Sequence, residues 1–148
     1  MADKTYKVTA TKGESAVVTV QARNHSIVID EPAGQGGTDM GMNPVELLLS
    51  SIASCLALTL SIYSEAMGVK AQNIEIGVEG LIDSAGMKGS RKASPGLKKI
   101  QVTVNAQSNV EPETFQQVVD LVLLRCPVED SVAHGVAFEE PIVNIRQI

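Results

Sequence analysis

Basic residues, histidine and cysteine are scarce in this chain of 148 residues, and each scarcity excludes a class of function. Two histidines are present, His25 and His134, and neither has metal-ligand spacing to a cysteine, so the sequence predicts no metal site. Lysine and arginine number 12 against 17 acidic residues, which gives a net charge of −5. Because a phosphate backbone requires a basic protein surface, we expect no nucleic-acid partner.

Targeting, membrane and nucleotide-binding patterns are also missing. The first residues, MADKTYKVTATKGES, contain no apolar stretch of the kind found in secretory signals, so we expect a cytoplasmic protein. Residues 47–63 are apolar but interrupted by serines and a threonine, and they fall short of the roughly 20 apolar residues that a bilayer requires. We interpret them as a buried core helix and expect no membrane association. The glycines of residues 34–41 lack the spacing of a nucleotide-binding loop, so no cofactor is expected.

The sequence predicts one domain over residues 1–148. Its elements are expected in the order strands, helix, strands, helices and a last strand. Residues 6–11, 16–22 and 26–30 are short β-branched runs separated by turn residues, which predicts an antiparallel meander. A glycine-rich loop follows at residues 31–41.

A strong helix start follows this loop. Asn43 is the predicted N-cap, Pro44 takes the first helical position and Glu46 completes a capping box. Gly68 is the predicted stop.

Two alternating strands come next, at residues 73–82 and 97–107, around the polar insert DSAGMKGSRKASPG. We interpret the insert, with its cations Lys88, Arg91 and Lys92, as a solvated hairpin loop; contact with a ligand or partner is the alternative. Glu111 opens a second helix, a third runs over residues 127–134, and residues 136–145 are predicted to form a strand.

The two cysteines, Cys55 and Cys126, lie in the strings NPVELLLSSIASC and LLLRCPVEDS. One interpretation is that both are buried structural residues, because free cysteine is among the most buried residue types. The other is redox chemistry, in which one thiol attacks a substrate and the second resolves the product as a disulfide. A cysteine hydrolase that uses His134 is a weaker alternative.

The local surroundings of the two thiols differ. Cys126 precedes Pro127 and therefore occupies an N-cap, where the helix terminus favours a thiolate, although two acidic residues in the first turn oppose this effect. Cys55 lies mid-helix among apolar residues that disfavour a charged sulfur, so it needs a cation from elsewhere. Arg23 and Arg125 are the candidates, although each is more readily explained as a solvated surface residue.

The strings GGTDMGMNPVELLLSSIASC and LRCPVEDSV, with the order of elements, resemble the osmotically inducible protein C and organic hydroperoxide resistance superfamily (OsmC/Ohr). This resemblance implies an α+β fold in an intertwined homodimer, with the Cys-bearing helix near the dimer centre. It implies that Cys55 is the peroxidatic thiol, that Cys126 is the resolving thiol, and that a dithiol reduces their disulfide.

The chain departs from the hydroperoxidase pattern at Val45, where those branches carry a glutamate that holds an arginine against the thiolate. At about 100° per residue, Glu46 lies on the opposite side of the helix from Cys55, so it is better explained as a capping residue. The family arginine is expected near the first hairpin turn, where this chain has Lys12-Gly13-Glu14. These departures point to a less characterised branch.

The sequence therefore predicts an OsmC-like protein that reduces organic hydroperoxides through Cys55 and Cys126. Two alternatives remain open. One is a non-catalytic protein that binds a small hydrophobic ligand at the dimer interface, and the other is a structural or interaction role. Retention of both cysteines favours the enzyme, and the valine at position 45 favours the alternatives.

Overall fold

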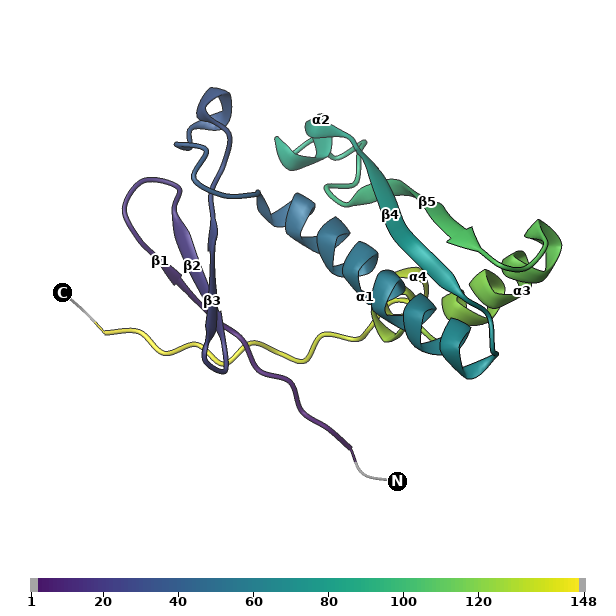
Figure 1. Cartoon of the computed structure of the whole chain (residues 1–148). Helices are drawn as coiled ribbons and strands as arrows, with labels where there is room; N and C mark the ends of the chain where they lie inside the picture. Colours follow the sequence, from purple (N-terminus) through teal and green to yellow (C-terminus); the bar gives the residue numbers. More distant parts are fainter. Residues whose placement is uncertain (1–2, 147–148) are drawn as a thin grey trace. The chain divides into compact units, whose positions relative to one another are not determined.

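The computed structural model describes residues 3–146 (Figure 1). Contacts between residues are concentrated in two compact units, an N-terminal unit that ends at Ser51 and a C-terminal unit that begins at Ile52. Helix α1 (Pro44–Ala66) runs through the division. The expectation of one domain over residues 1–148 stays a prediction.

The N-terminal unit contains a three-stranded antiparallel sheet of β1 (Thr9–Lys12), β2 (Val18–Ala22) and β3 (His25–Ile29), in that order. The predicted meander is confirmed, although the first strand begins three residues later than expected. In the central strand, Val20 lies opposite Ala10 on one side and Ile27 on the other.

The loop between β3 and α1 folds around the buried carboxylate of Asp30 and contains a short 3-10 helix, η1 (Ala33–Gln35). Asp30 accepts hydrogen bonds from the hydroxyl of Thr38 at 2.6 Å and from the backbone amides of Glu31, Thr38 and Met40 at 2.8, 2.9 and 3.2 Å. The Thr38 hydroxyl contributes most to holding the pKa of Asp30 down at about 2; burial opposes it, and the amides add to it. One charged side chain thus fixes a loop with little regular structure.

The start and end of α1 agree with the prediction. The backbone amide of Asn43 donates to Glu46 at 2.8 Å, and the amide of Glu46 donates to the Asn43 side chain at 2.9 Å, which is a complete capping box. After the last helical residue, Gly68 adopts φ 70°, a left-handed conformation that glycine reaches without strain.

Only one stripe of α1 is buried in the described chain, namely Ile52, Leu56, Leu60 and Ser64. By length and composition alone, α1 is apolar enough to cross a membrane. Its most apolar stretch of 18 residues has a mean hydropathy of 1.9, and 17% of that stretch is buried in the described chain. The prediction of a buried core helix therefore holds for one face. The opposite face exposes Leu58 and Ile62, at 68% and 63% of their surface.

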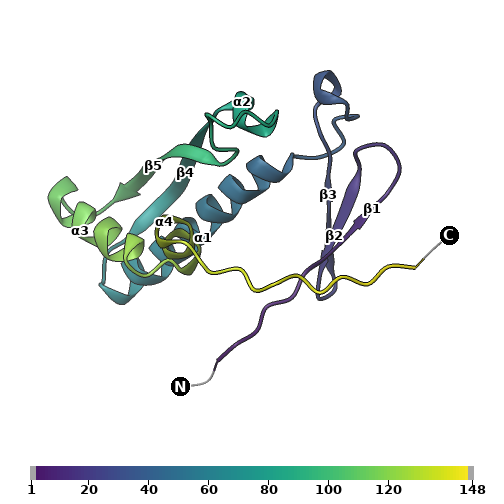
Figure 2. The same ribbon diagram turned by 180° about the vertical axis from the view of Figure 1, so that it is seen from behind.

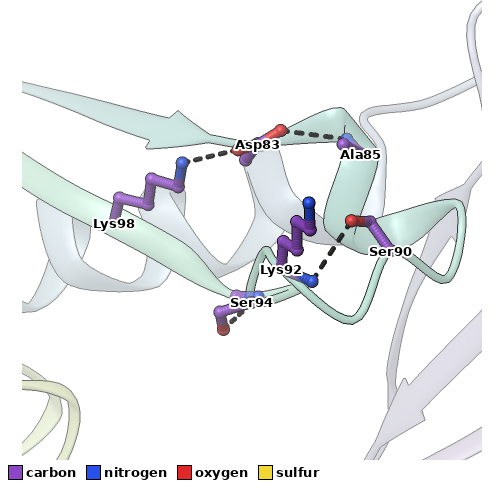
Figure 3. Close-up of polar contacts among 7 residues, drawn as sticks. Asp83, Ala85, Ser90, Lys92, Ser94 and Lys98 are labelled. Atoms are coloured by element: carbon purple, nitrogen blue, oxygen red, sulfur yellow. Dashed lines mark hydrogen bonds and ion pairs between the residues drawn. The ribbon is translucent and has the colours of Figure 1, made fainter.

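The C-terminal unit is built on an antiparallel hairpin of β4 (Ala71–Ile82) and β5 (Leu97–Ser108). The insert between them carries a short helix, α2 (Ser84–Met87), within the predicted loop. Asp83 accepts from the Ala85 amide at 3.0 Å and pairs with Lys98 at 2.6 Å, as Figure 3 shows. Lys98 first, and then the Ala85 amide, lowers the pKa of Asp83. The insert is a hydrogen-bonded, exposed cap on the hairpin.

Two further helices, α3 (Pro112–Leu123) and α4 (Pro127–His134), follow the hairpin and confirm the second and third predicted helices. They lie beside the C-terminal half of α1 in both views (Figures 1 and 2). Leu56 and Leu60 of α1 meet side chains of β4, β5 and α3 around one apolar gap, completed by Ile76, Val104, Val119, Val122 and Leu123. This is the core of the unit.

The predicted strand at residues 136–145 is wrong. After Gly135 the described chain has no further helix or strand, and Phe138 and Ile142 are 100% and 91% exposed. A strand exists only where its backbone groups pair with a neighbouring strand, and Pro141 removes one donor from this segment. Alternating apolar residues signalled a strand, but no edge within the described chain pairs with them.

Candidate functional site

Cys55 lies about three turns into α1, at the border between its buried stripe and its exposed apolar face. At about 100° per residue, its side chain is about 60° from buried Ile52 and about 20° from exposed Ile62. Its own exposure is intermediate. The thiol is therefore neither sealed in the core nor free on the surface.

Cys126 occupies the N-cap of α4, as predicted, with φ −80° and ψ 112°. Its carbonyl accepts the first helical hydrogen bond, from the amide of Asp130 at 3.0 Å, and Pro127 takes the first helical position. The side chain is fully buried, with 0% of its surface exposed. Local sequence thus fixes the backbone here, and the tertiary fold buries the sulfur.

The structure brings the two thiols into contact. The side chains of Cys55 and Cys126 lie close enough to interact, and both cysteines are free thiols. The sulfur of Cys126 also faces the backbone amides of Val128 and Glu129, although these do not form a regular capping bond. Two residues far apart in the sequence therefore form one dithiol site, which the sequence could only offer as a possibility.

The electrostatic balance at Cys126 differs from the prediction. Burial raises the pKa of Cys126 most strongly, and its interaction with Cys55 raises it further. The amides of Glu129 and Val128 lower the pKa, as expected at a helix terminus, but their effect is the smaller one. The predicted effect of the helix terminus is therefore present, but burial outweighs it and the pKa of Cys126 is raised.

The two candidate arginines occupy different places in the chain. Arg125, directly before the buried cysteine, has an exposed side chain, and its backbone amide donates to Val122 at 3.0 Å. Arg23 lies in the turn between β2 and β3 of the N-terminal unit, with φ 57°. In residues 3–146, neither guanidinium forms an ion pair. Their role in activating Cys55 stays a prediction.

The other predicted residues have structural partners. Glu46 serves the capping box, and Val45 beside it is half-buried. His134 contacts Asp130 on its own helix, at 3.1 Å from the carboxylate and 3.2 Å from the carbonyl oxygen. Within the described part of the chain, no group of three or more potential metal ligands is present.

Sequence reasoning did not identify Thr59, whose hydroxyl donates to the carbonyl of Cys55 at 2.7 Å. A threonine four residues after a helical residue commonly makes this contact, so the spacing was the available signal. The bond ties the backbone at Cys55 to the next turn of α1.

An apolar groove lies beside the core of the C-terminal unit, between β5 and α3. It is lined by Val102, Val104, Phe115, Gln116, Val119 and Leu123. Its single polar lining residue makes it suited to an apolar ligand.

Comparisons with known proteins agree with this architecture. The family model described as OsmC-like protein matches residues 36–140, which include both cysteines. The hydroperoxide reductase of Mycoplasma genitalium is 25% identical over 138 residues, which cover 90% of this chain and 89% of that protein.

Two solved structures illustrate the likeness in fold. An OsmC-like protein from Mycoplasma pneumoniae has a TM-score of 0.79 at 22% identity, with 89% of each chain covered. An organic hydroperoxide resistance protein of Bacillus subtilis has a TM-score of 0.56 at 25% identity, with 87% of this chain and 90% of that one covered. The α+β fold expected from the sequence is confirmed.

Proposed function

The chain belongs to the OsmC-like family, and on this premise we propose that it is a thiol-dependent reductase of organic hydroperoxides. The observation that carries the proposal is the contact between two free thiols, one partly exposed and one fully buried. Such a pair has one sulfur that a substrate reaches and a second sulfur close enough to form a disulfide with it. The relative from Mycoplasma genitalium, named a hydroperoxide reductase, supports the same chemistry.

In the first step, the thiolate of Cys55 attacks the terminal oxygen of the hydroperoxide. The S–O bond forms as the O–O bond breaks, and the alkoxide takes a proton and leaves as an alcohol. Cys55 becomes a sulfenic acid. Cys55 suits this role because it is the less buried of the two sulfurs.

In the second step, the sulfur of Cys126 attacks the sulfenic acid. A disulfide forms, and the thiol proton of Cys126 leaves with the sulfenic hydroxyl as water. An external dithiol then reduces the disulfide through a mixed disulfide and is itself oxidised to a disulfide. Because the cycle needs both thiols to be regenerated, it suits a reducing cytoplasm.

We further propose that the protein is a homodimer that covers the exposed face of α1. Leu58 and Ile62 lie one turn apart on this face and expose more than half of their surface. Cys55 borders the same face, so a second copy would close the site from the side that the described chain leaves open. An exposed apolar face of this kind marks an interaction site in most proteins.

The test is oxidation of the reduced protein by cumene hydroperoxide. We expect one disulfide between Cys55 and Cys126, detected by mass spectrometry as the loss of two hydrogens and of both free thiols. Cys126→Ser should stop at a sulfenic acid on Cys55, and Cys55→Ser should form neither product. Oxidation of Cys55 no faster than that of a free model thiol at neutral pH would reject the proposal.

Binding of a small hydrophobic ligand without catalysis is the second candidate function. The apolar groove between β5 and α3 favours it. Saturable binding of a fatty acid or a fluorescent apolar probe, lost in a Phe115→Lys variant of the groove, would support this function. Failure of the probe to bind the wild-type protein would reject it.

A further inference from the structure

The insert between β4 and β5 concentrates positive charge in a chain that is acidic overall. Residues 88–99 contain five of the 12 basic residues of the chain and no acidic residue. All five are exposed, namely Lys88, Arg91, Lys92, Lys98 and Lys99. Lys98 pairs with Asp83 at 2.6 Å, whereas within residues 3–146 the other four form no ion pair. We call residues 83–99 the basic cap.

Hydrogen bonds within the basic cap order its backbone. The amide of Lys92 donates to the hydroxyl of Ser90 at 3.3 Å, and the amide of Gly96 donates to the hydroxyl of Ser94 at 3.2 Å. Figure 3 shows these contacts, and the ammonium group of Lys92 makes none of them. Gly86 lies so close to the backbone of Ser94 that a side chain would not fit between them. The free cations therefore extend from an ordered loop.

The opposite end of the hairpin carries the opposite charge. The two views place α2 and α3 at opposite ends of β4 and β5 (Figures 1 and 2). Residues 111–124, which include α3, contain Glu111, Glu113 and Asp120 and no basic residue. An anionic surface therefore attracts the basic cap and repels the far end of the hairpin, which orients the C-terminal unit.

Two exposed apolar side chains border the cations. Met87 of α2 directly precedes Lys88 and is 63% exposed. Leu81 is 59% exposed and lies opposite Lys99 in the β4–β5 register. Residues 81–99 contain no aromatic residue on which a nucleic-acid base could stack. Apolar side chains among several cations suit an anionic lipid surface, because the headgroups attract the cations and the acyl boundary accepts the apolar groups.

We propose that the basic cap is a docking surface for bilayers of anionic phospholipid. Lys88, Arg91 and Lys92 contact the headgroups, and Met87 enters the boundary below them. This binding is peripheral and needs no membrane-spanning helix, so it revises the expectation of no membrane association, which rested on residues 47–63. The inference goes beyond the proposed function. One consequence rests on that function, namely that a docked reductase reaches hydroperoxides formed within the bilayer.

The test is co-sedimentation of the reduced protein with vesicles at about 0.1 M salt, where the Debye length is about 10 Å. We expect binding to vesicles of phosphatidylglycerol and phosphatidylcholine in equal parts, and none to phosphatidylcholine alone. Each cation near an anionic surface strengthens binding about fivefold, so loss of three cations should weaken it at least about 100-fold. The variant that tests this carries Lys88→Glu, Arg91→Glu and Lys92→Glu.

The matched control has the same net charge but leaves the basic cap intact. It carries Lys4→Glu, Lys7→Glu and Lys70→Glu, at three lysines that are exposed elsewhere. Because salt screens distant charges, this control should lose far less binding than the cap variant. Equal losses in the two variants would indicate an effect of net charge and would overturn the inference. Circular dichroism confirms that each variant is folded before sedimentation.

A second pair of variants tests the apolar contact. Met87→Ser should weaken vesicle binding severalfold, whereas Met40→Ser, at a methionine that is 66% exposed, should not. Equal effects of the two substitutions would count against insertion of the cap. Binding of the wild type to a DNA duplex but not to anionic vesicles would assign the cations to nucleic acid and overturn the inference.

Sedimentation requires neither peroxide nor a thiol, so it is repeated with Cys55→Ser, which should bind as the wild type does. The inference and the proposed function therefore fail separately. Vesicle binding without fast oxidation of Cys55 by cumene hydroperoxide would retain the inference and reject the function. Fast oxidation without vesicle binding would do the reverse.

Discussion

Ser64 gives the sharpest test of how the core of the C-terminal unit is stabilised. Its side chain is 1% exposed, on the same stripe of α1 as Leu56 and Leu60, and among the described residues its hydroxyl has no hydrogen-bond partner. A buried hydroxyl without a partner loses its hydrogen bonds to water and gains none in return. We therefore expect Ser64→Ala to stabilise the protein.

The size of the effect follows from two contributions. Alanine is the better helix former by about 0.5 kcal/mol, and removal of an unsatisfied buried hydroxyl adds about 1–3 kcal/mol. Ser61, one turn earlier on α1, is exposed, so Ser61→Ala should gain the first contribution alone. The difference between the two variants, at least about 1 kcal/mol, isolates the cost of the buried hydroxyl.

The assay is thermal unfolding of the reduced protein, followed by circular dichroism at one fixed protein concentration. For a chain of this size, 1 kcal/mol corresponds to a rise of roughly 2–4 °C. Ser64→Ala should therefore unfold at least about 2 °C above Ser61→Ala. If the two variants unfold at the same temperature, the hydroxyl of Ser64 is satisfied in solution and the reasoning is refuted.

Two further predictions concern the loop and the exposed face. Because the pKa of Asp30 is held down at about 2, its carboxylate contributes stability that is present above its ordinary pKa of 3.8 and is lost as the pH falls through about 2. Asp30→Asn should abolish that part of the acid dependence, measured as the loss of folded signal in an acid titration followed by circular dichroism, whereas an unchanged titration would contradict it. Leu58→Lys should convert the proposed dimer to a monomer, measured by analytical ultracentrifugation. Leu124→Lys changes a residue that is also exposed and should leave the dimer intact. Equal behaviour of the two variants would count against a dimer through α1.

The elements that sequence predicted well are those specified by neighbouring residues. The Asn43 and Glu46 capping box and the Pro127 start of α4 are contacts within one turn, and both are present where expected. The strand at residues 136–145 is the opposite case. Its alternating residues are local, but the edge with which a strand pairs is not, and none exists for it in the described chain.

The predictions for the two thiols were likewise correct where neighbouring residues decide the outcome and incomplete where the tertiary fold does. Each cysteine was placed correctly by its own motif, at mid-helix for Cys55 and at the N-cap for Cys126. The raised pKa of Cys126 was not predicted, because a helix terminus is visible in the sequence and complete burial is not. Burial outweighs the amides of the helix terminus and keeps Cys126 a neutral thiol. A neutral thiol is a poor first nucleophile, so the burial of Cys126 gives unequal chemistry to two cysteines that the sequence presents as a pair.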